Sequence, residues 1–138
     1  SIEGYSDGYE RVLEQLSAAG IAVVVVHDTP APGDGGRIES VPDCLATSLP
    51  DTAACSGPRT DWISIDPDPA TTAARHIGDR RITSVDLNDR ICGPQRCEPV
   101  VGGVTVYFDA SHLTATYART LAPAMDQAIR DAGVMPPG

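Results

Sequence analysis

The stretch IAVVVVHD, residues 21–28, decides the fold class. Its continuous run of apolar, mostly β-branched residues is typical of a parallel strand that is buried on both faces. Before it, apolar side chains recur at helical spacing from Tyr9 to Leu16, and Gly20 ends the pattern. A helix, a glycine and a buried strand make half of a βαβ unit, so the sequence predicts an α/β protein.

Two further strands are expected after this stretch. Residues 82–87 alternate in polarity, and VTVYF at residues 104–108 is a short apolar run. Before the first of these, Asp68 as N-cap and Pro69 as first residue predict a helix. Strands that alternate with helices indicate a mostly parallel sheet flanked by helices, in which ligands bind beyond the carboxyl ends of the strands. No strand precedes the first helix, so we expect the first strand or strands of the sheet to be missing from this chain.

The first and last helices have their own signals. Ser6 or Asp7 is expected to cap a helix that begins near Gly8. Apolar residues four apart across residues 113–129 predict a buried stripe on the last helix. Pro123 lies within this pattern and is expected to kink the helix.

Composition narrows the classes of partner. The 138 residues suit a single domain, and the net charge of −9 argues against binding to nucleic acid or to anionic lipid. No apolar run approaches the roughly 20 residues that a membrane span needs. The opening SIEGYSDGYE lacks the features of a signal peptide and an initiator methionine, so we expect Ser1 to be a cut.

Four cysteines form two local pairs, Cys44 with Cys55 and Cys92 with Cys97. Zinc favours closer spacings such as C-x2-C, so we expect two disulfides in preference to a zinc site or free thiols. No metal and no cofactor is expected. Disulfides indicate an oxidising, extracytoplasmic compartment.

Asp109 and His112 form a candidate catalytic pair at a strand-to-helix junction. A carboxylate at this spacing can hold the histidine Nδ1–H and leave Nε2 free to accept a proton from a hydroxyl. The alternative is that Asp109 or Ser111 is simply the N-cap of the last helix, with a solvated histidine in its first turn.

Other polar residues follow the first two strands. His27, Asp28 and Thr29 come after the buried run, and Asn88 follows the second strand. We expect these four residues to line a substrate site at the carboxyl edge of the sheet. Strand-end capping and turn chemistry are the alternatives.

The segment DLNDRICGPQRCEPVVGGVTVYFDASHLTATYARTLAPAM, residues 86–125, resembles the C-terminal block of SGNH hydrolase-like domains. It is most similar to those fused to membrane acyltransferase-3 proteins, which O-acylate exported glycans. In that family a strand leads into D-x-x-H-L-[ST] and a closing helix, with a cysteine pair just upstream. The segment GYERVLEQLSAAGIAVVVVHDTPAP, residues 8–32, is similar to the family's helix, glycine and strand, and DCL and AAC match its first cysteine pair.

This resemblance implies a flavodoxin-like SGNH fold with Asp109 and His112 as catalytic residues. It also implies a serine nucleophile in a G-D-S turn near the start of the domain, which is not found in this chain. We therefore expect residues 1–138 to be one domain, the C-terminal portion of a larger SGNH-like domain, and to be inactive alone.

The resemblance further implies a reaction and its partners. An acyl group such as acetyl would move to or from a hydroxyl of a carbohydrate or glycolipid acceptor. The partners would be the upstream part of the domain that carries the serine and a membrane acyltransferase-3 domain of the same protein. The chain would then lie outside the cytoplasm, in the cell envelope, tethered to the membrane.

Two other readings stay open. The chain could be a noncatalytic, secreted α/β binding module that keeps the fold. It could also be a self-sufficient hydrolase with Ser6 or Ser111 as nucleophile, which would need that hydroxyl within hydrogen-bond reach of His112.

Overall fold

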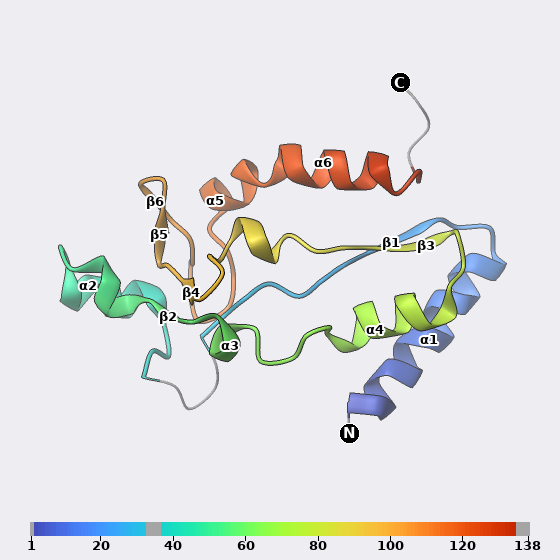
Figure 1. The fold of residues 1–138 in the computed structure, drawn as a ribbon, viewed down its shortest axis with the longest axis horizontal. Coiled ribbons are helices and arrows are strands. Elements are labelled where there is room, and N and C mark those ends of the chain that lie inside the picture. The colour runs from blue at the N-terminus through green and yellow to red at the C-terminus, as the bar shows by residue number, and fades with distance from the viewer. Residues whose placement is uncertain (1, 33–36, 135–138) are drawn as a thin grey trace. The chain divides into compact units, whose positions relative to one another are not determined.

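The structure is a computed structural model that describes residues 2–32 and 37–134 (Figure 1). The chain folds as two compact units. The first contains residues 1–28, 65–86 and 123–138, and the second contains residues 29–64 and 87–122. Helices and small sheets occur together, which confirms the predicted α/β class.

The first unit is built around two parallel strands. Its elements are α1 (Ile2–Ala18), β1 (Val23–Val26), α4 (Pro69–Ile77), β3 (Ile82–Val85) and nearly all of α6 (Ala122–Asp131). Strand β1 pairs in parallel with β3, with Val23 opposite Ile82 and Val26 opposite Val85. The core of this unit consists of Leu13, Val25, Ala73, Ala74 and Ile82.

Local signals explain the ends of these helices. Asp68 caps α4 by accepting hydrogen bonds from the amides of Ala70 and Thr71, and Gly78 ends the helix with a φ of 65°. The expected start of α1 near Gly8 was wrong, because the helix begins at Ile2 and Ser6 is buried within it.

The second unit is made of short elements held by disulfides. It contains α2 (Val41–Ser48), η1 (Thr52–Cys55), β2 (Gly57–Pro58), α3 (Arg59–Trp62), η2 (Asn88–Arg90), β4 (Arg96–Cys97), β5 (Val100–Val101), β6 (Val104–Thr105) and α5 (Ala115–Thr120). Both expected disulfides, Cys44–Cys55 and Cys92–Cys97, are formed.

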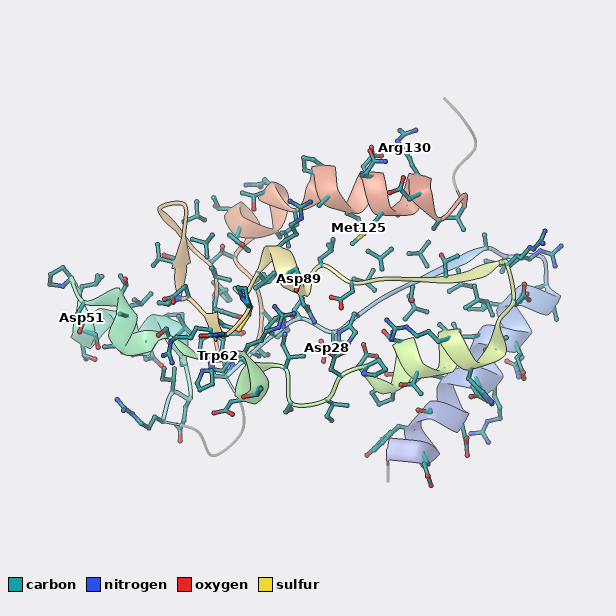
Figure 2. All side chains as sticks on the ribbon, in the orientation of Figure 1. Asp28, Asp51, Trp62, Asp89, Met125 and Arg130 are labelled. Carbon is teal, nitrogen blue, oxygen red and sulfur yellow. A yellow bond between two sulfur atoms is a disulfide. The ribbon has the colours of Figure 1, made fainter. Side chains whose placement is uncertain are left out.

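The core of the second unit centres on two aromatic rings. Trp62, labelled in Figure 2, packs edge-to-face on Tyr107 with ring centroids 5.5 Å apart. Around them lie the buried residues Val41, Leu45, Cys55, Ile91, Cys92, Cys97, Val106, Tyr117 and Leu121. The Tyr107 hydroxyl donates to the carbonyl of Pro30 at 2.7 Å, so the buried phenol is satisfied.

The expected third parallel strand at residues 104–108 was wrong. Only β6 is extended there, and it pairs antiparallel with β5. The two strands are joined by Gly102 and Gly103, whose φ angles of 58° and 78° make a tight hairpin turn that favours glycine.

The expected last helix is divided in two. Helix α5 ends at Thr120 and α6 begins at Ala122, with Pro123 near its start. Proline lacks the amide donor and clashes with the preceding turn, so it does not continue α5. Within the expected stripe, Tyr117 and Leu121 are buried, whereas Met125 is only half-buried. Among the described residues, no helix has the length and apolar character to cross a membrane.

Candidate active site

The loop that carries Asp109 and His112 is closed by backbone contacts in the second unit. Tyr107 and Leu113 form an antiparallel bridge, and the Phe108 amide donates to the His112 carbonyl at 2.8 Å. The two residues therefore lie in a short loop with a fixed base.

The carboxylate of Asp109 collects three hydrogen bonds. Its Oδ1 accepts from the backbone amides of Ser111 at 2.9 Å and His112 at 2.7 Å. Its Oδ2 lies 2.8 Å from His112 Nδ1. The two amides and the imidazole together lower the pKa of Asp109 to about 2, so the acid is ionised at neutral pH.

The imidazole of His112 is oriented by this carboxylate. An ionised carboxylate can only accept, so the Nδ1 atom carries the hydrogen and the Nε2 atom of the neutral ring has the lone pair. Among the described residues, His112 makes side-chain hydrogen bonds through Nδ1 alone, and its side chain is 77% exposed. The pair can therefore take a proton from a hydroxyl at Nε2.

The alternative that Asp109 or Ser111 caps the last helix was wrong. The N-cap of α5 is Thr114, whose hydroxyl oxygen accepts from the Tyr117 amide at 3.1 Å. His112 precedes the helix. Asp109 instead stabilises a turn of its own, in which its side chain replaces a backbone acceptor.

Thr114 is a residue of this site that we did not predict. Its hydroxyl donates to the Thr105 carbonyl at 2.7 Å, and its amide donates to the Val106 carbonyl at 2.8 Å. The hydroxyl thus connects β6 with the first turn of α5. Thr114 itself lies two positions after His112. Its signal was the threonine that follows His112–Leu113, which is a favoured N-cap type.

The expected substrate-lining residues belong to different units. Asp28, labelled in Figure 2, is exposed in the first unit, where the His27 side chain is 0% exposed. Thr29 is half-buried and Asn88 is buried in the second unit. Contact of these four residues with a substrate stays a prediction.

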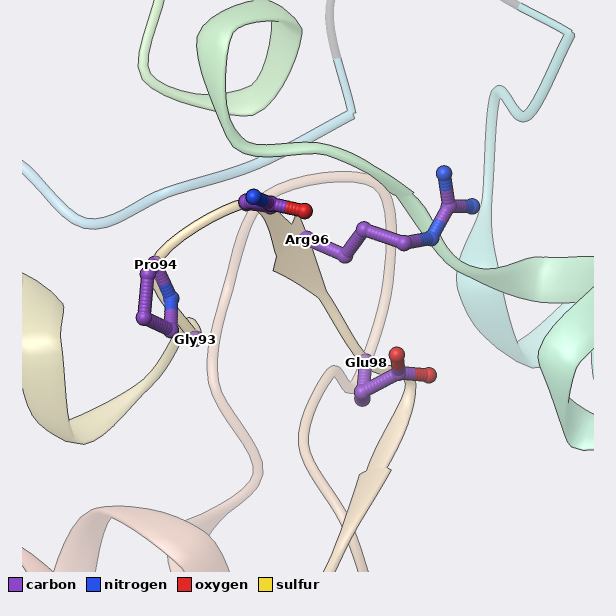
Figure 3. A pocket seen from close by; sticks show the side chains of 5 residues that line it. Gly93, Pro94, Arg96 and Glu98 are labelled. Carbon is purple, nitrogen blue, oxygen red and sulfur yellow. The ribbon is translucent and has the colours of Figure 1, made fainter.

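A shallow hollow of about 340 Å³ lies over the Cys92–Cys97 loop in the second unit (Figure 3). It is lined by Gly93, Pro94, Gln95, Arg96 and Glu98. The Arg59 guanidinium donates to the carbonyl of Gly93, one of these residues, at 3.2 Å and to Asp89 at 2.7 Å. Asp109 and His112 are not among its lining residues.

Among the described residues, no group of three or more histidine, cysteine, aspartate or glutamate side chains is placed to hold a metal ion. The site consists of an ionised carboxylate and an oriented imidazole in a loop closed by backbone hydrogen bonds.

Residues 2–127 match the family described as SGNH domain (fused to AT3 domains), where AT3 denotes acyltransferase-3. The chain therefore belongs to the SGNH domain family, as its resemblance indicated, and it is a domain of the hydrolase and acyltransferase type. Neither the curated proteins nor the solved structures with which it was compared gave a match.

Proposed function

We propose that this chain is the C-terminal portion of an SGNH domain that moves an acyl group, such as acetyl, to or from a carbohydrate hydroxyl. The observation that carries the proposal is the hydrogen-bonded pair of Asp109 and His112 in a closed loop. Membership of the AT3-fused family supports an acyl-transfer chemistry and a membrane-associated parent protein. The two disulfides support an extracytoplasmic location.

In the proposed mechanism, His112 Nε2 removes the proton from a serine hydroxyl that lies upstream of this chain. The serine oxygen attacks the acyl carbonyl, and the resulting imidazolium is stabilised by the Asp109 carboxylate. His112 then returns the proton to the oxygen of the leaving alcohol. A carbohydrate hydroxyl or water, deprotonated in turn by His112, then attacks the acyl carbonyl and breaks the serine ester bond, and His112 returns the proton to the serine oxygen.

The test uses a parent polypeptide that includes the region upstream of Ser1, with p-nitrophenyl acetate as acyl donor and a fluorophosphonate probe for the serine. We expect probe labelling and His112-dependent turnover in the parent, and neither in the 138-residue chain. Replacement His112→Gln should lower kcat by roughly 10³-fold or more in the parent, since the base that activates the serine is lost.

A matched control is available on the surface of the first unit. His76 Nδ1 lies 2.6 Å from Glu10 Oε1, and its side chain is 76% exposed, much as His112 is. Variant His76→Gln should leave turnover unchanged. Unchanged turnover in His112→Gln would exclude His112 as the base. A parent that showed neither turnover nor probe labelling but still bound a glycan would replace this proposal with the noncatalytic binding module. Turnover that depends on His112 in the chain alone would instead point to a nucleophile within it, such as Ser111.

A further inference from the structure

His27 occupies a buried position at the end of β1 in the first unit. Its side chain is 0% exposed, and its amide donates to the Val85 carbonyl at 2.8 Å, which continues the pairing with β3. Three carboxylates act on its ring from the elements around it: Asp68 and Asp66 from the segment before α4, and Asp86 from the end of β3. A buried imidazole in this position is not used by the proposed mechanism.

The two ring nitrogens of His27 face different kinds of partner. Nδ1 lies 2.9 Å from the Asp28 carbonyl, which can only accept, so Nδ1 carries a hydrogen. Nε2 lies 3.3 Å from the Asp68 amide, a donor, and also 3.3 Å from Asp66 Oδ1, an acceptor when ionised. One nitrogen cannot satisfy both at once. A lone pair on Nε2 suits the amide, and a hydrogen on Nε2 suits the carboxylate.

We propose that His27 is a proton-operated latch between the end of β1 and the segment that precedes α4. With Nε2 protonated, the imidazolium pairs with Asp66 and holds this segment against the strand. With Nε2 deprotonated, the ring accepts from the Asp68 amide, and the Asp66 carboxylate turns to solvent. Asp66 is suited to this movement because its side chain is 60% exposed.

Asp68 provides the fixed part of the latch. Its Oδ1 accepts from the Ala70 and Thr71 amides at 2.9 and 3.0 Å, and its Oδ2 accepts from the Thr71 hydroxyl at 2.8 Å and the Asp28 amide at 3.0 Å. Burial alone would raise the pKa of Asp68, but these hydrogen bonds outweigh it and lower the pKa. Asp68 thus stays ionised and holds the start of α4 in both states, so the change is confined to the side of Asp66.

The direction in which the pKa of His27 is shifted determines whether the latch closes at low or at high pH. Burial lowers this pKa. The Asp28 carbonyl and the carboxylates of Asp68, Asp86 and Asp66 together raise it by more, so the pKa lies above the ordinary 6.5. A group whose pKa rises on folding stabilises the folded state fully below its unfolded value. The latch is therefore closed at pH 6.5 and below, and it opens as the pH rises through the pKa of the folded state.

The test follows the ring of His27, the amide of Asp68 and the carboxyl of Asp66 by NMR of the labelled chain from pH 5 to about 9. We expect the three signals to share one midpoint above 6.5, with Nε2 as the nitrogen that loses its proton. Variant Asp66→Asn removes the charged partner from the exposed side of the latch, and it should lower that midpoint. Variant Asp7→Asn, which neutralises an exposed carboxylate on α1, is the matched control and should leave it unchanged.

Three results would overturn the latch. The first is a His27 midpoint at or below 6.5 in the native chain. The second is an equal midpoint in Asp66→Asn and the native chain. The third is an Asp68 amide that does not follow the titration of His27. None of these measurements depends on catalysis, so failure of the latch is separate from failure of the proposed function.

Discussion

At the scale of the residue, two exposed histidine–carboxylate pairs differ in how the acid is held. Glu10 reaches His76 from α1 at the end of a flexible side chain. Asp109 is fixed by two backbone amides before it meets His112. Exposed ion pairs contribute little by themselves, so the backbone hydrogen bonds, more than the ion pair, give the second pair a defined geometry. This is the geometric requirement for a base that must accept a proton from one direction.

The amide donors make a prediction for the titration of Asp109. We expect a pKa of about 2 in the folded chain, below the ordinary 3.8, when the carboxyl carbon is followed by ¹³C NMR. Because the pKa falls on folding, the stabilisation is present above pH 3.8 and is lost as the pH drops through about 2. Variant His112→Ala should raise the pKa only in part, since both amides stay. A carboxyl that titrates at 3.8 or higher in the native chain would contradict this account.

At the scale of the element, the sequence predicted those parts whose signal is local. The valine run became β1, although the strand is not buried on both faces, because Val26 is exposed. Asp68 with Pro69 began α4. The spacing of Asp109 and His112 predicted their contact, because three residues suffice to form the turn. The expected strand at residues 104–108 failed because its apolar run is typical of a buried strand, whereas the run pairs through β6 in a short hairpin. The Gly102–Gly103 pair before it is a local signal for such a hairpin. His27 contacts Asp66 and Asp68, which lie some forty positions away in the sequence, so no local pattern could show these contacts.

Helix α5 gives a prediction that separates its cap from its packing. Variant Thr114→Val keeps the shape of the side chain but removes the hydroxyl that serves the Tyr117 amide and the Thr105 carbonyl. We expect a loss of about 1 kcal/mol in the free energy of unfolding measured in urea, and faster exchange of the His112 Nδ1 hydrogen. Thr114→Ser retains the hydroxyl and should stay close to the native chain. Equal stability of the valine and serine variants would exclude the cap as the cause.

At the scale of the whole molecule, the two units have different sources of stability. The first buries a small aliphatic core between its helices and its parallel strands. The second holds both disulfides, and its regular elements are short. Short elements make few backbone hydrogen bonds of their own, so covalent links are expected to add to the stability that the core around Trp62 and Tyr107 supplies. The loop of Asp109 and His112 belongs to this second unit, so the disulfides and the candidate site lie in the same unit.

Reduction should therefore act on the unit that carries the candidate site. The disulfides join residues 11 and 5 positions apart, so the chain-entropy relation gives a combined stabilisation of about 5 kcal/mol. A loss of this size approaches the whole stability of a small domain. With dithiothreitol, we expect hydrogen exchange to accelerate at Ile91, Val106 and Tyr117, which are buried in the core of the second unit. The double variant Cys44→Ala, Cys55→Ala keeps one disulfide and should show an intermediate effect. Unchanged protection at these amides under reduction would mean that packing alone holds the unit.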